Sequence, residues 1–205
     1  MIQLVEGTMH PAFSLTCLEE ERDFRERYWK VREGDVVVDA GASYGAYTLT
    51  ALDAGASFVF AFEPEPSIAE DLRRNLAANG WEDRCAVVDS ALWDCPAVVD
   101  MKDYAPHWPA QTITRGYPAA RLDDMVGTMS RLDWFKLDVE GAELQALRGA
   151  EDLLTRLKPR VIVESHTFLD PELTDKCRAI LAGYGYNTFE VVPRDPCEML
   201  IARPR

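Results

Sequence analysis

The sequence predicts an α/β fold with a doubly wound, mostly parallel sheet, and three observations lead to that class. Short apolar runs alternate with helix-prone segments along most of the chain, which is the pattern of βαβ crossovers. The apolar runs are continuous, as expected of strands that are buried on both faces of a parallel sheet. The length of 205 residues suits one domain with a sizeable core.

The predicted strands are short runs rich in valine, phenylalanine and isoleucine, each bounded by turn residues. The parallel part of the sheet is expected at residues 36–38, 58–62, 86–88, 134–137 and 160–163. Two further β-prone runs, 186–192 and 198–202, are separated by Pro193-Arg-Asp-Pro196. This closing pair predicts a β-hairpin.

The predicted helices lie before, between and after these strands. They cover residues 18–30, 46–54, 67–79, 143–158 and 173–182. Ser67 with Glu70 three residues later has the pattern of a capping box, so Ser67 is expected to be an N-cap. Pro159 and Gly183 are expected to end the last two helices.

The chain is expected to form one domain at residues 18–205, preceded by an arm at 1–17 that has little pattern. Residues 94–120 are rich in proline and aromatic side chains and predict an irregular insert. No run reaches the roughly 20 apolar residues of a membrane span. The first residues lack the basic and apolar regions of a secretory signal.

Charge and cysteine content narrow the function classes. Lys and Arg number 22 and Asp and Glu number 35, so the net charge is −13. This excess of acid argues against a nucleic acid or an anionic membrane as a partner, because both need a basic surface. The five cysteines are odd in number and include no Cys-x-x-Cys pair, so no zinc template is predicted. We expect reduced thiols and a cytoplasmic location.

Ligands of doubly wound sheets lie at the carboxyl ends of the strands, so the residues after each strand are the site candidates. The turn after the first strand is Asp39-Ala-Gly41-Ala-Ser43-Tyr44-Gly45, whose glycines permit a tight turn and a close approach to a ligand. A dinucleotide site would need a glycine at position 43 to make room for a pyrophosphate. Because Ser43 stands there, the turn favours an adenosine ligand without a diphosphate.

The second and third strands end in polar groups. Glu63 is expected to accept hydrogen bonds from both ribose hydroxyls of such a ligand. Asp89 and Ser90 are weaker candidates for contact with the adenine edge. A solvated glutamate and an ordinary turn-forming Asp-Ser pair are the alternatives.

The fourth and fifth strands lead into groups with catalytic chemistry. Lys-Leu-Asp-Val-Glu-Gly-Ala-Glu occupies residues 136–143, and Glu-Ser-His occupies residues 164–166. We expect these two segments to lie side by side at the same sheet edge. The alternatives are that Asp138 or Glu140 only caps the following helix and that His166 is structural.

With these motifs the chain resembles the FkbM family of S-adenosylmethionine-dependent methyltransferases, over about residues 18–170. The most specific block is the one at 136–143, followed by Leu-Arg-Gly-Ala at 147–150. The other matching stretches are Gly-Asp-Val-Val-Val-Asp-Ala-Gly-Ala-Ser-Tyr-Gly at 34–45, Phe-Glu-Pro at 62–64, Arg-Leu-Asp-Asp at 121–124 and Val-Ile-Val-Glu at 161–164.

The resemblance implies a Rossmann-like methyltransferase sheet of seven strands, in the order 3-2-1-4-5-7-6 with strand 7 antiparallel. It also implies S-adenosylmethionine as the cofactor and O-methylation of a sugar, polyketide or similar small metabolite. Asp39, Gly41 and Gly45 would shape the methionine end of the cofactor pocket. The full set of cofactor candidates is Asp39, Gly41, Ser43, Tyr44, Gly45, Glu63, Asp89, Ser90 and Asp138.

Methyl transfer to a hydroxyl calls for a base that takes the acceptor proton. His166 is the first candidate, because an unperturbed imidazole titrates near neutrality, and Asp138 is the second. Glu140 or Glu164 would orient either one, and Lys136 would hold an acceptor oxygen or pair with Glu140. A divalent cation, magnesium or manganese, on Asp138, Glu164 and His166, with Glu140 as a further ligand, ranks below metal-free chemistry.

The insert at 94–120 is the expected cover of the acceptor. Its candidate contacts are Tyr104, His107, Trp108, Arg115 and Tyr117. A mobile surface loop is the alternative for this segment. For the whole protein, the alternatives are a non-catalytic protein that binds the adenosyl cofactor and, less favoured, a nicotinamide-dependent oxidoreductase.

Overall fold

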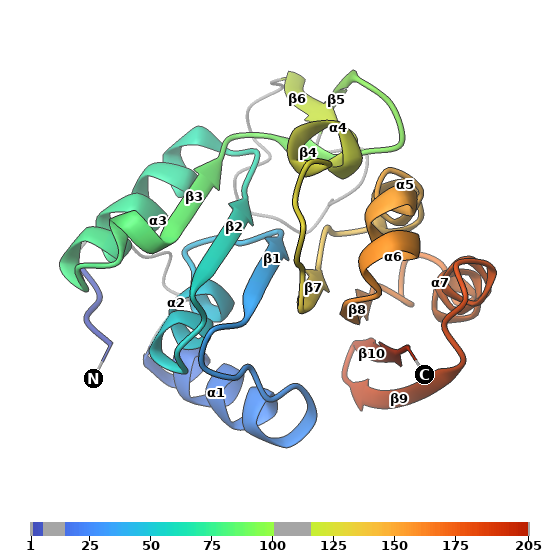
Figure 1. Cartoon of the computed structure of the whole chain (residues 1–205), viewed down its shortest axis with the longest axis horizontal. Helices are drawn as coiled ribbons and strands as arrows, with labels where there is room; N and C mark the ends of the chain where they lie inside the picture. Colours follow the sequence, from blue (N-terminus) through green and yellow to red (C-terminus); the bar gives the residue numbers. More distant parts are fainter. Residues whose placement is uncertain (1, 6–14, 101–115, 205) are drawn as a thin grey trace.

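The computed structural model describes residues 2–5, 15–100 and 116–204. It places one large sheet at the centre, with helices on both faces (Figure 1). Seven strands form this sheet in the order β3-β2-β1-β7-β8-β10-β9. Their bounds are Val36–Ala40 (β1), Phe58–Phe62 (β2), Cys85–Val88 (β3), Trp134–Leu137 (β7), Arg160–Ser165 (β8), Thr188–Arg194 (β9) and Cys197–Arg203 (β10).

Counted along the chain within this sheet alone, the seven strands have the predicted order 3-2-1-4-5-7-6. The strand numbers differ because β4, β5 and β6 intervene in the sequence and form a second sheet. β1 pairs in parallel with β2 and β7, whereas β10 runs antiparallel to both β8 and β9. The predicted hairpin and the antiparallel seventh strand are therefore confirmed.

Helices bury both faces of the large sheet. Successive residues of a strand point to opposite faces. Val37 therefore joins the apolar core around Leu49, and Val38 joins the core around Leu147. The first core is covered by α1 (Leu15–Tyr28), α2 (Ala46–Asp53) and α3 (Pro66–Ala78), and the second by α5 (Glu143–Arg148), α6 (Glu151–Leu157) and α7 (Leu173–Gly183).

The second sheet corrects the expectation of an irregular insert. β4 (Ala91–Leu92), β6 (Gly116–Ala120) and β5 (Ala97–Asp100) form it in that order. Figure 1 shows it with α4 (Leu122–Val126) beyond the carboxyl ends of β1 and β2. The Tyr117 hydroxyl donates to the Glu65 carboxylate at 2.5 Å, which ties this sheet to the start of α3. The other predicted acceptor contacts, Tyr104, His107, Trp108 and Arg115, lie outside the described residues.

Two helix predictions are wrong at their boundaries. The N-cap of α3 is Glu65, whose carboxylate accepts from the Ser67 backbone N–H, so Ser67 lies inside the helix. The single helix expected over 143–158 is divided into α5 and α6. Trp93, the residue after β4, passes close to Gly149. A Cβ at position 149 would lie only 1.9 Å from the Trp93 carbonyl oxygen, so this position needs glycine.

The described start of the chain lies against α3. The Gln3 N–H donates to Asn79 Oδ1 at 2.8 Å, and the Val5 N–H donates to Asn75 Oδ1 at 3.0 Å. The arm boundary at residue 17 stays a prediction, since residues 6–14 are outside the described ones. No described helix is long and apolar enough to span a bilayer.

Candidate active site

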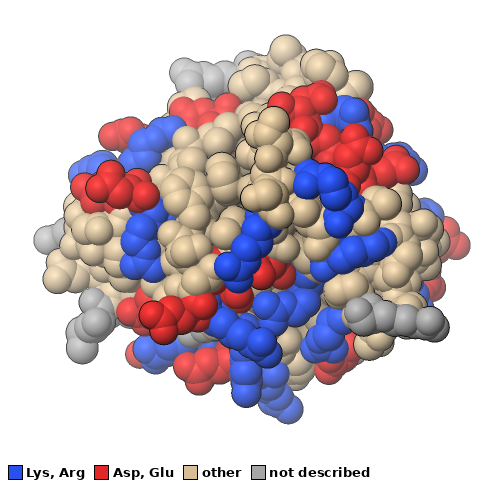
Figure 2. All heavy atoms as spheres, in the orientation of Figure 1, with Lys and Arg blue, Asp and Glu red and all other residues tan. Residues whose placement is uncertain are grey.

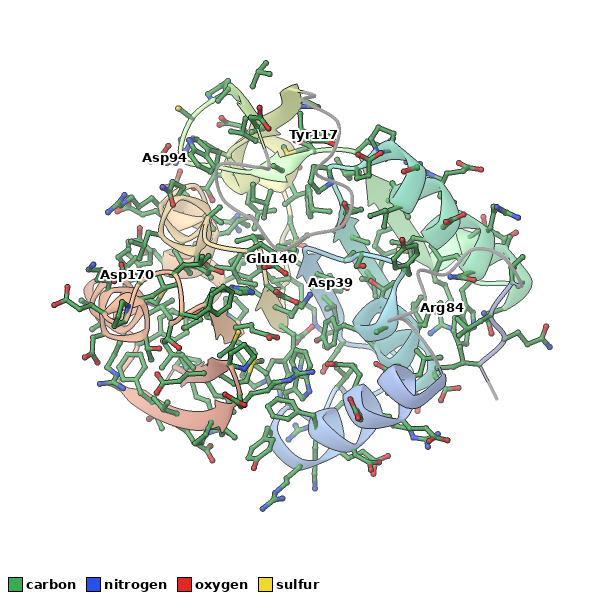
Figure 3. All side chains as sticks on the ribbon, turned by 180° about the vertical axis from the view of Figure 1, so that it is seen from behind. Asp39, Arg84, Asp94, Tyr117, Glu140 and Asp170 are labelled. Carbon is green, nitrogen blue, oxygen red and sulfur yellow. The ribbon has the colours of Figure 1, made fainter. Side chains whose placement is uncertain are left out.

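The candidate site lies where β1, β7 and β8 end next to one another. Ala40 pairs with Leu137, and Leu137 pairs with Val163, so β1 and β7 end at the same level and β8 continues for two residues beyond it. Figure 3 labels Asp39 and Glu140 near the centre of the molecule at this edge. The structure therefore brings together the segments after these strands, as the sequence predicts.

The turn after β1 has a backbone that requires glycine at two positions. Gly41 has φ +75°, and a Cβ there would lie 1.7 Å from the Asp138 carbonyl oxygen. Gly45 has φ +99°, precedes α2, and would place a Cβ 2.4 Å from Leu72 Cδ1. Ser43 between them also has a left-handed φ of 49°. In this structure the close approaches that the glycines permit are to the end of β7 and to α3.

Glu63, just beyond the end of β2, is held by backbone amides. Its Oε2 accepts from the Ser43 N–H at 3.0 Å, and its Oε1 accepts from the Glu65 N–H at 2.9 Å. The residue is 6% exposed, and burial raises the pKa of its carboxyl group to about 7 in spite of both hydrogen bonds. A carboxylate has about four acceptor positions, so these two bonds leave roughly two for hydroxyl groups of a ligand.

Asp39 and Lys136 form a buried ion pair beneath the turn. Asp39 Oδ1 lies 3.0 Å from Lys136 Nζ, and Asp39 Oδ2 accepts from Thr48 Oγ1 at 2.6 Å. Lys136 Nζ also donates to the Gly41 carbonyl at 2.8 Å and lies 3.4 Å from Asp138 Oδ2. Burial acts to lower the pKa of Lys136, but the charges of Asp39 and Asp138 outweigh burial and raise the pKa above its ordinary value.

This pairing changes the expected roles of both residues. Asp39 is fully buried, and its side chain contacts Lys136 and Thr48, so it acts on the turn after β1 only through these two residues. Lys136 pairs with Asp39 and Asp138, and the predicted pair with Glu140 is not the one that forms. Lys136 is therefore a group that positions the ends of β1 and β7.

His166, directly after β8, lies among three carboxylates. Its Nδ1 is 2.6 Å from Glu143 Oε1, and its Nε2 is 3.3 Å from Glu140 Oε2 and 3.7 Å from Asp138 Oδ1. His166 is 3% exposed. Burial acts to lower the pKa of His166, but the hydrogen bond to Glu143 and the three negative charges outweigh burial and raise the pKa to about 9.

Asp138 and Glu140 form the open side of this cluster. Each of their side chains is 29% exposed, so a molecule from solvent meets them before it meets His166. Glu140 has a left-handed φ of 54° and Gly141 a φ of 105°, which turns the chain sharply ahead of α5. Burial and the charge of Asp138 raise the pKa of Glu140.

Glu143 is a site residue to which the sequence analysis assigned no role. It is the first residue of α5 and is fully buried. Its Oε1 accepts from the Gly141 N–H at 3.1 Å and also contacts His166. Acidic residues are common in the first turn of a helix, because they interact favourably with the helix dipole. The sequence therefore gives no sign that Glu143 also contacts His166, and only its burial in the structure shows it.

Glu164, on β8, lies near His166 and pairs with an arginine. Its Oε2 is 3.4 Å from Arg194 Nη1, and Arg194 Nη2 is 3.6 Å from Glu21 Oε2 on α1. Burial raises the pKa of Glu164 to about 7. This carboxylate is therefore tied to the outer strands and α1.

Two groups of described side chains have the composition of a metal site. The ligand atoms of Asp138, Glu140 and His166 lie within 4.8 Å of one another, and so do those of Glu164, His166 and Cys197. The metal set expected from the sequence, Asp138, Glu164 and His166, is thus divided between two groups that share His166.

The remaining cofactor candidates bond within the protein. Asp89 pairs with Arg73 of α3, and the Ser90 hydroxyl donates to the Pro118 carbonyl at 3.1 Å. The Tyr44 carbonyl accepts from Asn75 Nδ2 at 3.2 Å. Contact of Asp89, Ser90 and Tyr44 with a cofactor stays a prediction.

The strand order, with charged groups gathered at the carboxyl ends, defines the class as Rossmann-like methyltransferases. A family model described as the methyltransferase FkbM domain matches residues 39–188. The chain belongs to this family, and it is a methyltransferase.

Several known proteins are similar to it. The 31-O-demethyl-FK506 methyltransferase FkbM of Streptomyces tacrolimicus is 28% identical, covering 82% of this chain and 77% of its own. The structure of methyltransferase FkbM from Methylobacillus flagellatus has a TM-score of 0.70 at 18% identity, over 87% of this chain and 46% of that one. This chain therefore spans less than half of the Methylobacillus protein. A SAM-dependent O-methyltransferase of Thermotoga maritima has a TM-score of 0.57 at 16% identity, over 98% of this chain and 67% of its own.

Proposed function

We propose that this protein is an S-adenosylmethionine-dependent O-methyltransferase that acts on a hydroxyl group of a small metabolite. The observation that carries the proposal is the presence of two complementary corners at one sheet edge. Glu63 keeps acceptor positions for ribose hydroxyls. On the far side of β1 from β2, after the neighbouring strands β7 and β8, lie Asp138, Glu140 and His166.

The cofactor would be held by Glu63 and by the turn after β1. When bound, S-adenosylmethionine would supply the electrophilic methyl group, carried on its sulfonium sulfur, for transfer to the acceptor oxygen. Gly41 and Gly45 keep the turn close to β7 and α3, and Lys136 fixes the turn from below. Positioning of this kind contributes up to about 7–11 kcal/mol of a reaction barrier.

The acceptor hydroxyl loses its proton as its oxygen bonds to the methyl carbon, and the open carboxylates are placed to receive it. Asp138 and Glu140 reach solvent, whereas His166 lies behind them with its Nδ1 on Glu143. This arrangement favours Asp138 or Glu140 for contact with the hydroxyl and His166 for holding their orientation. The His166 base expected from the sequence remains the alternative.

A small acceptor with an oxygen nucleophile fits two further observations. The name of the Streptomyces relative gives 31-O-demethyl-FK506 as its substrate, and we infer an oxygen acceptor here from that relationship. Acidic and basic side chains are interspersed over the face in Figure 2, and the net charge of −13 does not favour a polyanion.

The first test is titration calorimetry with S-adenosylhomocysteine. We expect saturable binding with a Kd below about 100 μM, and no heat at about 1 mM would contradict the proposal. Methylation of a panel of hydroxylated metabolites with radiolabelled S-adenosylmethionine then tests turnover.

Asp138→Asn distinguishes catalysis from binding alone. We expect turnover to fall by about 10²–10⁴-fold, as for loss of a general base, while S-adenosylhomocysteine still binds. The matched control is Glu172→Gln, which neutralises an exposed acid on the loop before α7. Binding without turnover on any acceptor in the unsubstituted protein would indicate a non-catalytic cofactor-binding protein.

A further inference from the structure

We propose that Asp138, Glu140 and His166 bind one divalent cation of the Mn²⁺ type, which holds the acceptor oxygen during methyl transfer. This inference rests on the proposed function for its catalytic meaning. Of the four candidate ligands expected from the sequence, this site keeps Asp138, Glu140 and His166 and leaves out Glu164.

The orientation of His166 is the first observation that points to a cation. The imidazole is 3% exposed, and its Nδ1 is fixed at 2.6 Å on the fully buried Glu143. A carboxylate on Nδ1 makes that nitrogen the donor, so Nε2 is the nitrogen that would bind a cation, with release of the Nε2 proton. Metal-binding histidines are commonly held by a carboxylate in this way.

The contacts of Nε2 are the second observation. Glu140 Oε2 lies at 3.3 Å and Asp138 Oδ1 at 3.7 Å, so both open carboxylates face this nitrogen. Nε2 therefore points between the two carboxylates. Neighbouring ligands of an ion with bonds of about 2.1 Å are roughly 3 Å apart, close to these spacings.

The charges around the cluster favour a cation at this point over the second group of possible ligands. Lys136 Nζ faces Asp138 Oδ2, which leaves Oδ1 directed at His166. Each group has a positive side chain beside it, since Arg194 lies 3.4 Å from the Glu164 carboxylate just as Lys136 lies 3.4 Å from Asp138. The group with Cys197 offers a single carboxylate, whereas a cation between Asp138 and Glu140 relieves the repulsion of two like charges.

The ligand set also indicates the kind of ion and its use. One imidazole nitrogen with two carboxylate oxygens suits Mn²⁺ better than the thiolate-preferring ions. Three protein ligands leave coordination positions open on the side where Asp138 and Glu140 reach solvent. An acceptor hydroxyl bound at such a position loses its proton more readily, because the cation stabilises the oxyanion.

The test is Mn²⁺ binding to the chelator-treated full chain, followed by electron paramagnetic resonance. We expect one ion per chain, and modulation of its spin echo by one ¹⁴N nucleus, from His166. Asp138→Asn and Glu140→Gln should each weaken binding at least tenfold, and Glu143→Gln should weaken it by about 10–100-fold without touching the ion. Glu172→Gln, an exposed acid elsewhere, should leave it unchanged.

Binding without the ¹⁴N coupling, or equal affinity in all variants, would overturn the metal site. The ¹⁴N signal comes from the unsubstituted protein, so the coupling result does not depend on any variant folding. S-adenosylhomocysteine titration of the same samples separates the two proposals. Loss of cofactor binding with intact Mn²⁺ coordination would refute the methyltransferase mechanism, whereas the reverse result would refute the metal site alone.

Discussion

The proposed cofactor corner, formed by residues 41–45 and Glu63, and the proposed catalytic corner, formed by Asp138, Glu140, Glu143 and His166, are built differently. In the cofactor corner a carboxylate is held by the backbone N–H groups of Ser43 and Glu65. In the catalytic corner the side chains hold one another, with His166 between Glu143 and the two open carboxylates. The first corner thus depends on backbone conformation, and the second depends on charge balance.

The Asp39–Lys136 pair joins these two corners. Lys136 Nζ reaches Asp39 and the Gly41 carbonyl on one side and Asp138 on the other. A change at this lysine should therefore disturb both corners, whereas changes within one corner should leave the other intact. The following predictions test that difference, from the largest expected effect to the smallest.

Lys136→Met should have the largest effect, because it leaves Asp39 charged, buried and without its cation. Breaking a buried pair in this way costs about 3–5 kcal/mol, measured as the free energy of unfolding in urea. Lys176→Met is the control, since Lys176 pairs with Asp170 and Glu172 at the exposed surface, where a pair contributes little. Equal losses of unfolding free energy in the two variants would show that the buried ion pair stabilises the fold no more than the exposed pairs do.

Gly41→Ala tests the backbone of the cofactor corner. The positive φ and a Cβ 1.7 Å from the Asp138 carbonyl oxygen combine strain with overpacking, so we expect a loss of about 2–4 kcal/mol in unfolding free energy. Gly80→Ala is a matched control with φ +68° and no atom within 4 Å of the added Cβ. The control variant should lose only the unfolding free energy that comes from backbone strain, about 1–2 kcal/mol. If Gly41→Ala loses the same amount, the close approach to the Asp138 carbonyl does not contribute.

Glu63→Gln should act on binding more than on folding. A hydrogen bond to a charged group contributes about 1.5–3 kcal/mol, so the affinity for S-adenosylhomocysteine should fall roughly tenfold to a hundredfold. The contacts of His166 are unaffected, so Mn²⁺ binding should not change. Unaltered cofactor affinity would exclude Glu63 from the ribose contact.

The same corner should respond to pH. The pKa of Glu63 is raised to about 7, so the carboxylate that would receive ribose hydroxyls becomes protonated as pH falls through that value. A protonated carboxyl is a weaker acceptor, and the affinity should therefore decrease below about pH 7 and level off above it. Calorimetry over about pH 6–8 should show this slope in the unsubstituted protein and a flat profile in Glu63→Gln.

Much of the fold followed from local sequence patterns. The seven strands of the large sheet, their order and the closing hairpin were all predicted, because continuous apolar runs and the known order of the resembling family leave few arrangements. Proximity of the 136–143 and 164–166 segments followed as well, since neighbouring parallel strands end at one edge. The glycine positions in the first turn were visible because few other residues accept a left-handed backbone.

The partners within the site were decided only by the tertiary structure. Lys136 pairs with Asp39 across β1 and β7, Glu143 is buried against His166, and Gly149 divides a helix because Trp93 passes close by. Each of these contacts joins two groups whose helices or strands are far apart in the chain. The sequence by itself determined which strands form the large sheet and at which edge of it the candidate residues gather. Long-range packing, which periodicity does not encode, selected the contacts and hence the burial and charge state of each group.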